Sequence, residues 1–225
     1  MDIINAKLKT HQLQEMKHFY GQILGFPIEK ETPNSFQVTF GISSIEFNDR
    51  DVVGEPYYHF AFDIPCNQFA EAKEWIKSKT ELLMEDGVDE IDFTFSFAKS
   101  FYFEDPAGNI LEFIARLKTN PPSDQPFSIA SIQKISEMSL VVEDKLPVAY
   151  HLSDYQIVSR DDSDMDTGSL AFMSDHKTKV FLLLTSPNRK WLFSEKVSKV
   201  FPITISLDSG LVVGVNDDGQ FYIQS

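Results

Sequence analysis

The sequence predicts an α+β fold of paired β-α-β-β-β modules that form a curled-sheet cavity, with a degenerate second half of the same β-α-β-β-β type. Within residues 1–117, the order strand, helix, three strands occurs twice. The proline-rich segment 118–126 cannot continue a helix or a central strand. We therefore expect a domain of two modules at residues 1–117, a linker at 118–126 and the degenerate half at 127–225.

The first module begins with a strand at residues 3–9. Apolar side chains at helical spacing predict a helix after it, namely Leu13, Met16, Phe19, Tyr20, Ile23 and Leu24. Gly25 follows as the helix stop, because glycine readily adopts the left-handed conformation in which many helices end. Short strands at residues 26–29, 35–40 and 43–48 complete the module.

The second module repeats this order. We expect a strand at residues 57–64, a helix with Phe69, Ala72, Trp75 and Ile76 at helical spacing, and strands at 81–84, 95–103 and 110–115. The segment Asp105-Pro106-Ala107-Gly108-Asn109 predicts a turn before the last strand. Proline presets φ in such a turn, and glycine permits a positive φ.

Beyond the linker the pattern is weaker. A short helix is expected at residues 145–152, and strands are expected at 135–142, 169–173, 179–185, 201–207, 211–215 and 220–224. The acidic stretch 161–168 lacks the glutamate that ends a calcium-binding loop, because Met173 stands at that place. We therefore expect a solvated loop there, and an exposed position for His176.

Composition excludes several classes of partner. The chain has 225 residues and a formal net charge of −14. Without a basic stripe we expect no nucleic-acid binding, and an anionic membrane surface would repel the chain. Cys66 is the single cysteine, so no intramolecular disulfide can form. The sequence starts without a secretory signal pattern and has no run of 18 apolar residues, which predicts a cytoplasmic protein.

Strand parity brings polar side chains to one face of the predicted sheets. Residues two apart on a strand share a face. The face opposite the helices receives Asn5, Lys7, Glu46, His59, Ala61 and Glu112. If two such sheets face each other, these side chains converge in one cavity. Two carboxylates and an imidazole suit Zn, Ni, Mn, Co or Fe. The alternative is a solvent-exposed sheet face, where an isolated glutamate needs no special role.

Three segments carry a resemblance to a known family. They are His18–Phe26 (HFYGQILGF), Tyr58–Pro65 (YHFAFDIP) and Phe101–Phe113 (FYFEDPAGNILEF). Together they resemble the glyoxalase / bleomycin-resistance / extradiol dioxygenase superfamily, also called vicinal oxygen chelate. The resemblance implies paired modules around a cavity, commonly with a divalent metal. In that pattern a His on the first strand, a Glu on the fourth, a His on the fifth and a Glu on the eighth hold the metal.

Carried onto this chain, the pattern places His59 on the fifth strand, Glu112 on the eighth and Glu46 on the fourth. Asn5 stands where the first-strand His would be, and an amide is a weaker ligand than an imidazole for transition metals. In the second half, Glu137 lies near the first-strand place, but no His partner follows it.

The resemblance leaves three functions open. A divalent metal on His59, Glu112 and Glu46 would act as a Lewis acid in a lyase or isomerase, with Glu112 or Glu46 as the catalytic base. A metal-free protein would instead bind a small aromatic or cationic molecule, for resistance or sequestration, with Asn5, Lys7 and Ala61 in the pocket wall. A ring-cleaving dioxygenase ranks lower, because only one candidate His is present. The modules pair within one chain or between two, so a homodimer is one of the alternatives.

Overall fold

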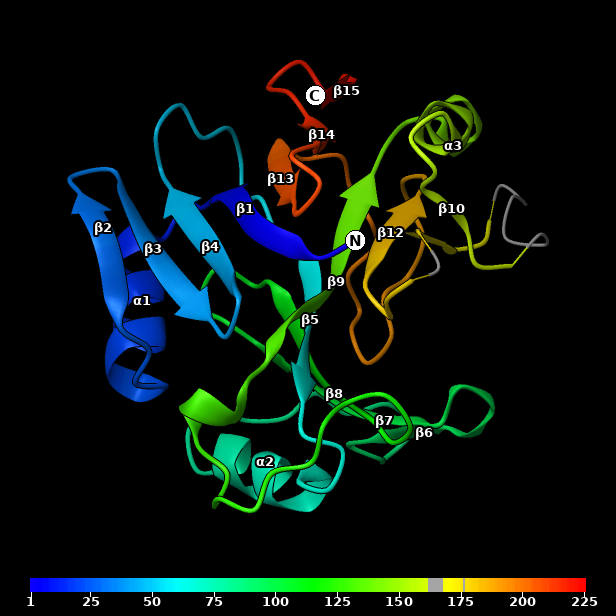
Figure 1. The fold of residues 1–225 in the computed structure, drawn as a ribbon. Coiled ribbons are helices and arrows are strands. Elements are labelled where there is room, and N and C mark those ends of the chain that lie inside the picture. The colour runs from blue at the N-terminus through cyan, green and yellow to red at the C-terminus, as the bar shows by residue number, and fades with distance from the viewer. Residues whose placement is uncertain (162–167, 176) are drawn as a thin grey trace.

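The computed structural model describes residues 1–161, 168–175 and 177–225. Most of the acidic loop at 161–168, and His176, lie outside the described residues. The described residues form two mixed sheets and three α-helices, which confirms the α+β class (Figure 1). No helix among them is long and apolar enough to cross a membrane.

The first half contains two modules. Module 1 consists of β1 (Ile3–Lys9), α1 (Leu13–His18), β2 (Ile28–Thr32), β3 (Ser35–Phe40) and β4 (Ser43–Asn48). Module 2 consists of β5 (His59–Ile64), α2 (Phe69–Lys77), β6 (Ile91–Phe93), β7 (Ala98–Glu104) and β8 (Ile110–Arg116). Helix α1 continues as a π-helical turn over Phe19–Ile23. Both modules follow the predicted order of one strand, one helix and three strands.

The second half repeats the pattern with losses. Module 3 consists of β9 (Lys134–Val141), α3 (Lys145–Ser153), β10 (Val158–Ser159), β11 (Ala171–Ser174) and β12 (Phe181–Thr185). Module 4 retains only β13 (Ile203–Leu207), β14 (Val212–Val215) and β15 (Phe221–Gln224). Residues 186–225 are all described and contain no helix.

Each sheet combines a module of the first half with a module of the second. The seven-stranded sheet has the order β15-β14-β13-β1-β4-β3-β2, and the eight-stranded sheet has the order β10-β11-β12-β9-β5-β8-β7-β6. At the junctions, β1 pairs with β13 and β5 pairs with β9, both antiparallel. Modules 1 and 2 therefore do not share a sheet, and the chain is held together by pairing across the linker.

One predicted strand is absent. Residues 81–84 form no strand, and Leu82 makes only an isolated bridge with Phe103. The edge strand is β6 instead. The expected strand 95–103 starts at Ala98, because residues 94–96 form a 3-10 turn and Phe97 has a φ of 53°. A left-handed residue interrupts an extended chain, so this turn separates β6 from β7.

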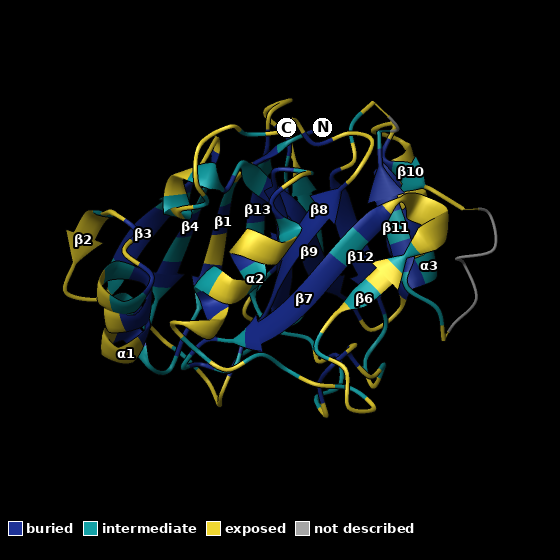
Figure 2. Cartoon of the chain, turned by 90° about the horizontal axis from the view of Figure 1, so that it is seen from below, coloured by how far each residue is buried: buried dark blue, intermediate teal, exposed yellow. Residues whose placement is uncertain are grey.

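The two sheets differ in what covers their polar faces. On β1 only Ile3, Ala6 and Leu8 are buried, and the residues between them are exposed or half-buried, as in a sheet with one face toward solvent. On β8 every residue is buried, and on β9 only the first is not. Figure 2 shows these central strands dark blue, with the exposed residues, in yellow, on the helices, the loops and the edge strands β2 and β6. The second face of the eight-stranded sheet is therefore covered, and the candidate site lies on that face.

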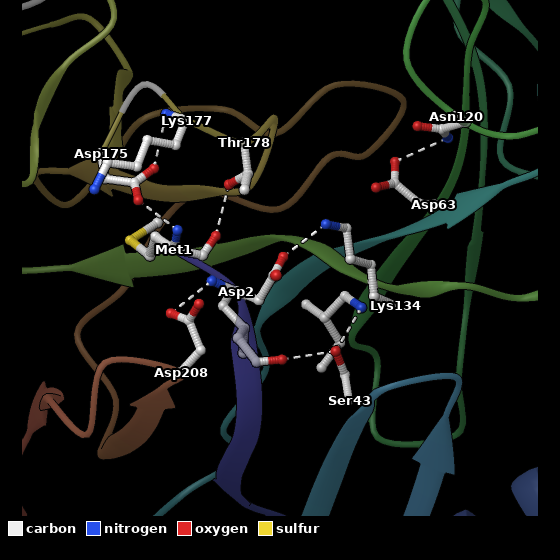
Figure 3. A network of polar contacts seen from close by, with 12 residues as sticks. Met1, Asp2, Ser43, Asp63, Asn120, Lys134, Asp175, Lys177, Thr178 and Asp208 are labelled. Atoms are coloured by element: carbon white, nitrogen blue, oxygen red, sulfur yellow. Dashed lines mark hydrogen bonds and ion pairs between the residues drawn. The ribbon is translucent and has the colours of Figure 1, made fainter.

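Polar contacts near the N-terminus join the halves (Figure 3). Lys134 Nζ lies 2.6 Å from Asp2 Oδ1. The Ser43 hydroxyl donates to the carbonyl of Ile3 at 2.6 Å and accepts from the amide of Ile135 at 3.0 Å. These bonds link β1, β4 and β9, so they fix the seven-stranded sheet against the start of module 3.

Candidate metal centre

Three adjacent strands of the eight-stranded sheet position one cluster of ligand groups. In the pairing register, Glu112 on β8 and Glu137 on β9 both lie opposite Ala61 on β5. His59 is two residues before Ala61 and so shares its face. Cross-strand neighbours on one face have Cβ atoms about 4.5–5.5 Å apart. The two carboxylates therefore flank β5, and the imidazole lies beside them.

The ligand atoms of the three side chains lie within 4.8 Å of one another, and all three residues are buried. His59 Nε2 is 3.5 Å from Glu112 Oε2. His59 Nδ1 is 3.0 Å from the carbonyl oxygen of Ile110, which can only accept a hydrogen bond. Nδ1 therefore carries a proton, and Nε2 is the nitrogen that faces the carboxylates and would coordinate an ion. Metal-binding histidines are held in this way.

An arginine adjusts the charge of the cluster. Arg116 Nη2 lies 2.5 Å from Glu137 Oε1, and Arg116 Nε lies 3.4 Å from Asp63 Oδ1. Burial raises the pKa of Glu137 to about 7; Arg116 opposes this rise, and the neighbouring Glu112 adds to it. Burial also raises the pKa of Asp63. The Arg116 guanidinium thus interacts with three buried carboxylates, those of Glu137, Asp63 and Glu112.

These residues fit a divalent cation. One imidazole nitrogen with two carboxylates is a donor set for borderline and hard ions such as Zn, Mn, Fe, Ni or Co. The surplus of buried negative charge favours a cation at this place. Three protein ligands also leave coordination positions open for water or substrate, as in catalytic sites.

The fourth-strand place of module 3 carries no ligand. In module 2, Glu112 pairs with the residue two after His59. The corresponding residue two after Glu137 is Ser139, which pairs with Leu183 on β12. Leu183 therefore occupies the place that corresponds to Glu112, so an apolar side chain closes this side of the cluster.

A cavity of about 890 Å³ opens onto the cluster. Its wall includes His59, Glu112 and Glu137, and also the aromatic residues Phe93, Phe95, Phe97, Tyr102, Phe172, Phe181 and Trp191. The Trp191 ring centroid is 5.1 Å from that of His59, and Tyr102 stacks on Phe193 at 4.8 Å. Burial raises the pKa of Tyr102, and the nearby Glu112 carboxylate raises it further, so this hydroxyl stays protonated. Pockets of this size and lining hold small organic molecules.

The structure brings together only part of the predicted site. His59 and Glu112 meet as expected, and Ala61 lies between the two carboxylates in the register. The expected convergence of Glu46 with His59 and Glu112 is wrong. Glu46 is on β4 of the seven-stranded sheet, where its carboxylate lies 3.7 Å from Lys7 Nζ.

Asn5 lies in the same seven-stranded sheet, where its amide donates to Ser44 Oγ at 2.8 Å. Asn5, Lys7 and Glu46 therefore lie outside the cavity wall. Their strand faces were predicted correctly. Modules 1 and 2 contact each other through their apolar faces, where the ring centroids of Phe40 and Phe62 lie 4.5 Å apart, so their polar faces do not share a cavity.

Glu137 is the candidate ligand that the sequence analysis did not include. The sequence places Glu137 near the first-strand ligand position of the degenerate half. Within its own half, however, no His stands at a strand position that would pair with it. The partners are His59 and Glu112 of module 2, because β9 pairs with β5. Pairing modules 2 and 3 at the sequence level would have found the cluster.

Two family models match the chain, on either side of the linker. Residues 4–113 match the Glyoxalase/Bleomycin resistance protein/Dioxygenase superfamily, and this range contains His59 and Glu112. Residues 135–189 match the Toxoflavin-degrading enzyme family, and this range contains Glu137. Among curated proteins, none matches the chain.

Solved structures share the fold at low sequence identity. A Bacillus subtilis subsp. subtilis str. 168 protein, provisionally named a dioxygenase, is 17% identical, with a TM-score of 0.54 over 82% of this chain and 63% of its own. The chain thus spans less than two thirds of that protein. Lactoylglutathione lyase from Agrobacterium tumefaciens is 20% identical, with a TM-score of 0.42 over 52% of this chain and 96% of its own.

A glyoxalase/bleomycin resistance protein/dioxygenase from Nocardioides is 19% identical, with a TM-score of 0.44 over 56% of this chain and 89% of its own. The matched residues 4–113 contain modules 1 and 2 almost completely, and both modules have the order of strand, helix and three strands that the resemblance implied. Through this match, residues 4–113 of the chain belong to the glyoxalase/bleomycin resistance protein/dioxygenase superfamily.

Proposed function

We propose that the cavity is the active site of a divalent-metal-dependent enzyme that degrades a small aromatic molecule. The observation that carries this proposal is the buried His59, Glu112 and Glu137 cluster, with the His59 tautomer set by the carbonyl of Ile110. The eight-stranded sheet, formed by modules 2 and 3, would curl around this cavity as paired modules do in the superfamily. Modules 1 and 4 would then support it from the other sheet.

Each side chain has a role in this proposal. A bound ion would supply Lewis-acid polarisation of oxygen atoms on the substrate. His59 Nε2 and the two carboxylates would hold that ion. Glu112 lies in the cavity wall, and its carboxylate would also accept a proton from a substrate carbon or hydroxyl. The protonated Tyr102 hydroxyl would hold Glu112 in place, and the covered sheet face would keep bulk water away.

The substrate class follows from the wall of the cavity and from the second family match. The aromatic residues offer flat faces to a flat molecule, which they would contact by stacking. Toxoflavin, in the name of the family that matches residues 135–189, is the first compound to test. A lyase or isomerase needs only the metal and a base. Ring cleavage would need oxygen as well, and measuring oxygen uptake during turnover separates the two.

Metal content and substrate loss test the proposal together. Protein purified without chelator should hold about one divalent ion per chain and consume toxoflavin. Removing the ion with a chelator should abolish consumption and lower the melting temperature, because an ion at 100 times its Kd adds about 2.7 kcal/mol of stability. Glu137→Gln should lose metal, whereas Glu46→Gln, in the other sheet, should keep both metal and activity. A metal-free protein that is stable and inert with every ion would contradict the proposal.

A metal-free binding protein is the second candidate, and one contact favours it. Arg116 already gives Glu137 a counter-ion, so this carboxylate is not dependent on a metal. Under this alternative the cavity would bind its ligand with full affinity in the presence of chelator, and Glu137→Gln would leave binding unchanged. Binding that depends on the ion supports the enzyme instead.

A further inference from the structure

Arginines gather at the cavity although the protein is acidic. The chain contains four arginines, Arg50, Arg116, Arg160 and Arg189, against a net charge of −14. Three of the four line this cavity, which takes its wall from 24 described residues. They come from β8, from the residue after β10 and from the connection between β12 and β13. Residues from three separate parts of the chain thus bring positive charge to one place.

Arg116 is committed to Glu137 and Asp63, but Arg189 is not committed to a carboxylate. Arg189 Nη1 donates a hydrogen bond to the carbonyl oxygen of Lys190 at 3.2 Å, and no acidic residue among the described ones forms an ion pair with Arg189. Burial lowers the pKa of Arg189, so the folded protein holds this cation partly desolvated. A desolvated cation without a counter-ion is costly unless a ligand supplies one.

Aromatic rings hold the cations at the cavity wall. Arg189 Cζ lies 5.6 Å from the Trp191 ring centroid, and Arg160 Cζ lies 4.0 Å from that of Phe172. Lys118 Nζ lies 3.1 Å from the ring centroid of Phe97. Each cation is within the range of a cation–π contact. Trp191 also contacts the His59 ring, so Arg189 and the proposed metal ligand share a neighbour.

We propose that this cavity contains an anion subsite, with Arg189 as its counter-ion, and that the ligand is a planar aromatic anion. Arg160 lines the same cavity but is already paired with Asp161, at 2.7 Å between Nε and Oδ2. The inference rests on the proposed use of the cavity as the substrate site and specifies the charge of the substrate. The ring of the ligand would stack on the aromatic wall, while its carboxylate or ionised enol would accept hydrogen bonds from the guanidinium of Arg189. A cationic ligand, which the acidic composition favours, would instead meet the arginines unfavourably.

Matched probes separate the charge of a ligand from its shape. We would use 4-nitrobenzoate, the neutral 4-nitrobenzamide and the cationic 4-nitrobenzylamine, each as a quencher of Trp191 fluorescence in full-length protein. Trp75→Phe removes the other tryptophan of the chain. Titrations on protein as purified and after metal removal show whether the preference depends on the ion. We expect the benzoate to bind about tenfold or more tightly than the amide, since charge-assisted bonds are stronger than neutral ones.

Variants then show which residue causes the preference for the anionic probe. Arg189→Gln should reduce benzoate affinity about tenfold and leave amide affinity unchanged, while Arg189→Lys should retain most of the preference. Arg50→Gln is the matched control, because it removes one arginine charge from an exposed residue outside the cavity wall. Equal affinity for the three probes, tighter binding of the cation, or an unchanged preference in Arg189→Gln would each overturn the inference. If the protein binds no metal but still prefers the benzoate, the metal-dependent function is refuted and the anion subsite is not.

Discussion

Arg116 and Glu137 stand on opposite sides of the proline-rich linker in the sequence and form a buried ion pair in the fold, with 2.5 Å between Nη2 and Oε1. Arg116 ends β8 of module 2, and Glu137 lies on β9 of module 3. The pair therefore joins the two modules that build the cavity. Its geometry depends on β5, which separates the two strands in the sheet.

Arg116→Met should destabilise the protein strongly. The substitution leaves Glu137 buried without its ion-pair partner and takes the Arg116 charge away from Asp63. Breaking a buried pair in this way typically costs about 3–5 kcal/mol. Urea denaturation measures the loss. Lys17→Met, which breaks the exposed pair with Glu31, is the control and should cost less than about 1 kcal/mol. Adding Glu137→Gln to Arg116→Met should recover part of the loss; no recovery would mean that the arginine acts mainly by packing.

Asp105 should make stability depend on pH in mildly acidic solution. This carboxylate accepts hydrogen bonds from Tyr20 and Asn109, yet burial raises its pKa from 3.8 to about 6. Between about pH 4 and 6 the folded protein holds this proton more tightly than the unfolded chain does. The free energy of unfolding therefore contains a contribution that falls as pH rises through this window, by up to about 3 kcal/mol.

Asp105→Asn should flatten this part of the pH profile, whatever its effect on overall stability. Urea midpoints measured at several values between pH 4 and 6 give the slope. Asp217→Asn removes an exposed carboxylate and should keep the wild-type slope. A variant profile parallel to that of the wild type would show that the proton is held elsewhere.

Leu183→His should tighten metal binding. Leu183 occupies the place in module 3 that corresponds to Glu112 in module 2 and lies on the cavity wall. Supporting groups of metal sites are worth about 10–100-fold in affinity, and a fourth ligand should give a gain of similar size. Calorimetric titration with Zn or Ni measures it. Asn5→His, in the seven-stranded sheet, should give no gain, and an equal gain from both variants would contradict the assignment of the site.

The fragment 127–225 should not fold alone, although the linker at 118–126 sets the proposed domain boundary. Its first strand, β9, pairs with β5, and β13 pairs with β1. Removing residues 1–126 exposes both strand edges and the core face of module 4, which has no helix of its own. Circular dichroism should show no cooperative thermal transition. Adding residues 1–126 in trans should restore one if the pairing alone limits folding.

Local patterns in the sequence determined the elements and their faces. Strand β1 was predicted at residues 3–9 and is found there, and the sheet faces of His59 and Glu112 were correct. These features depend on a period of two residues along one strand, and that period is written in consecutive side chains. The strand predicted at residues 81–84 is not formed, although these residues are mostly apolar. The turn at 94–97 instead places residues 91–93 at the edge of the sheet.

Which strands become neighbours was decided only by the tertiary structure. Glu46 and Glu137 are both glutamates at module positions that suit a ligand, and nothing within either strand distinguishes them. The pairing of β5 with β9 brings Glu137 to His59, while the pairing of β1 with β13 leaves Glu46 in the other sheet. Such pairing depends on contacts between residues far apart in the chain, which local periodicity does not encode. The sequence by itself therefore determined the modules and their polar faces, and the fold determined which polar faces share a cavity.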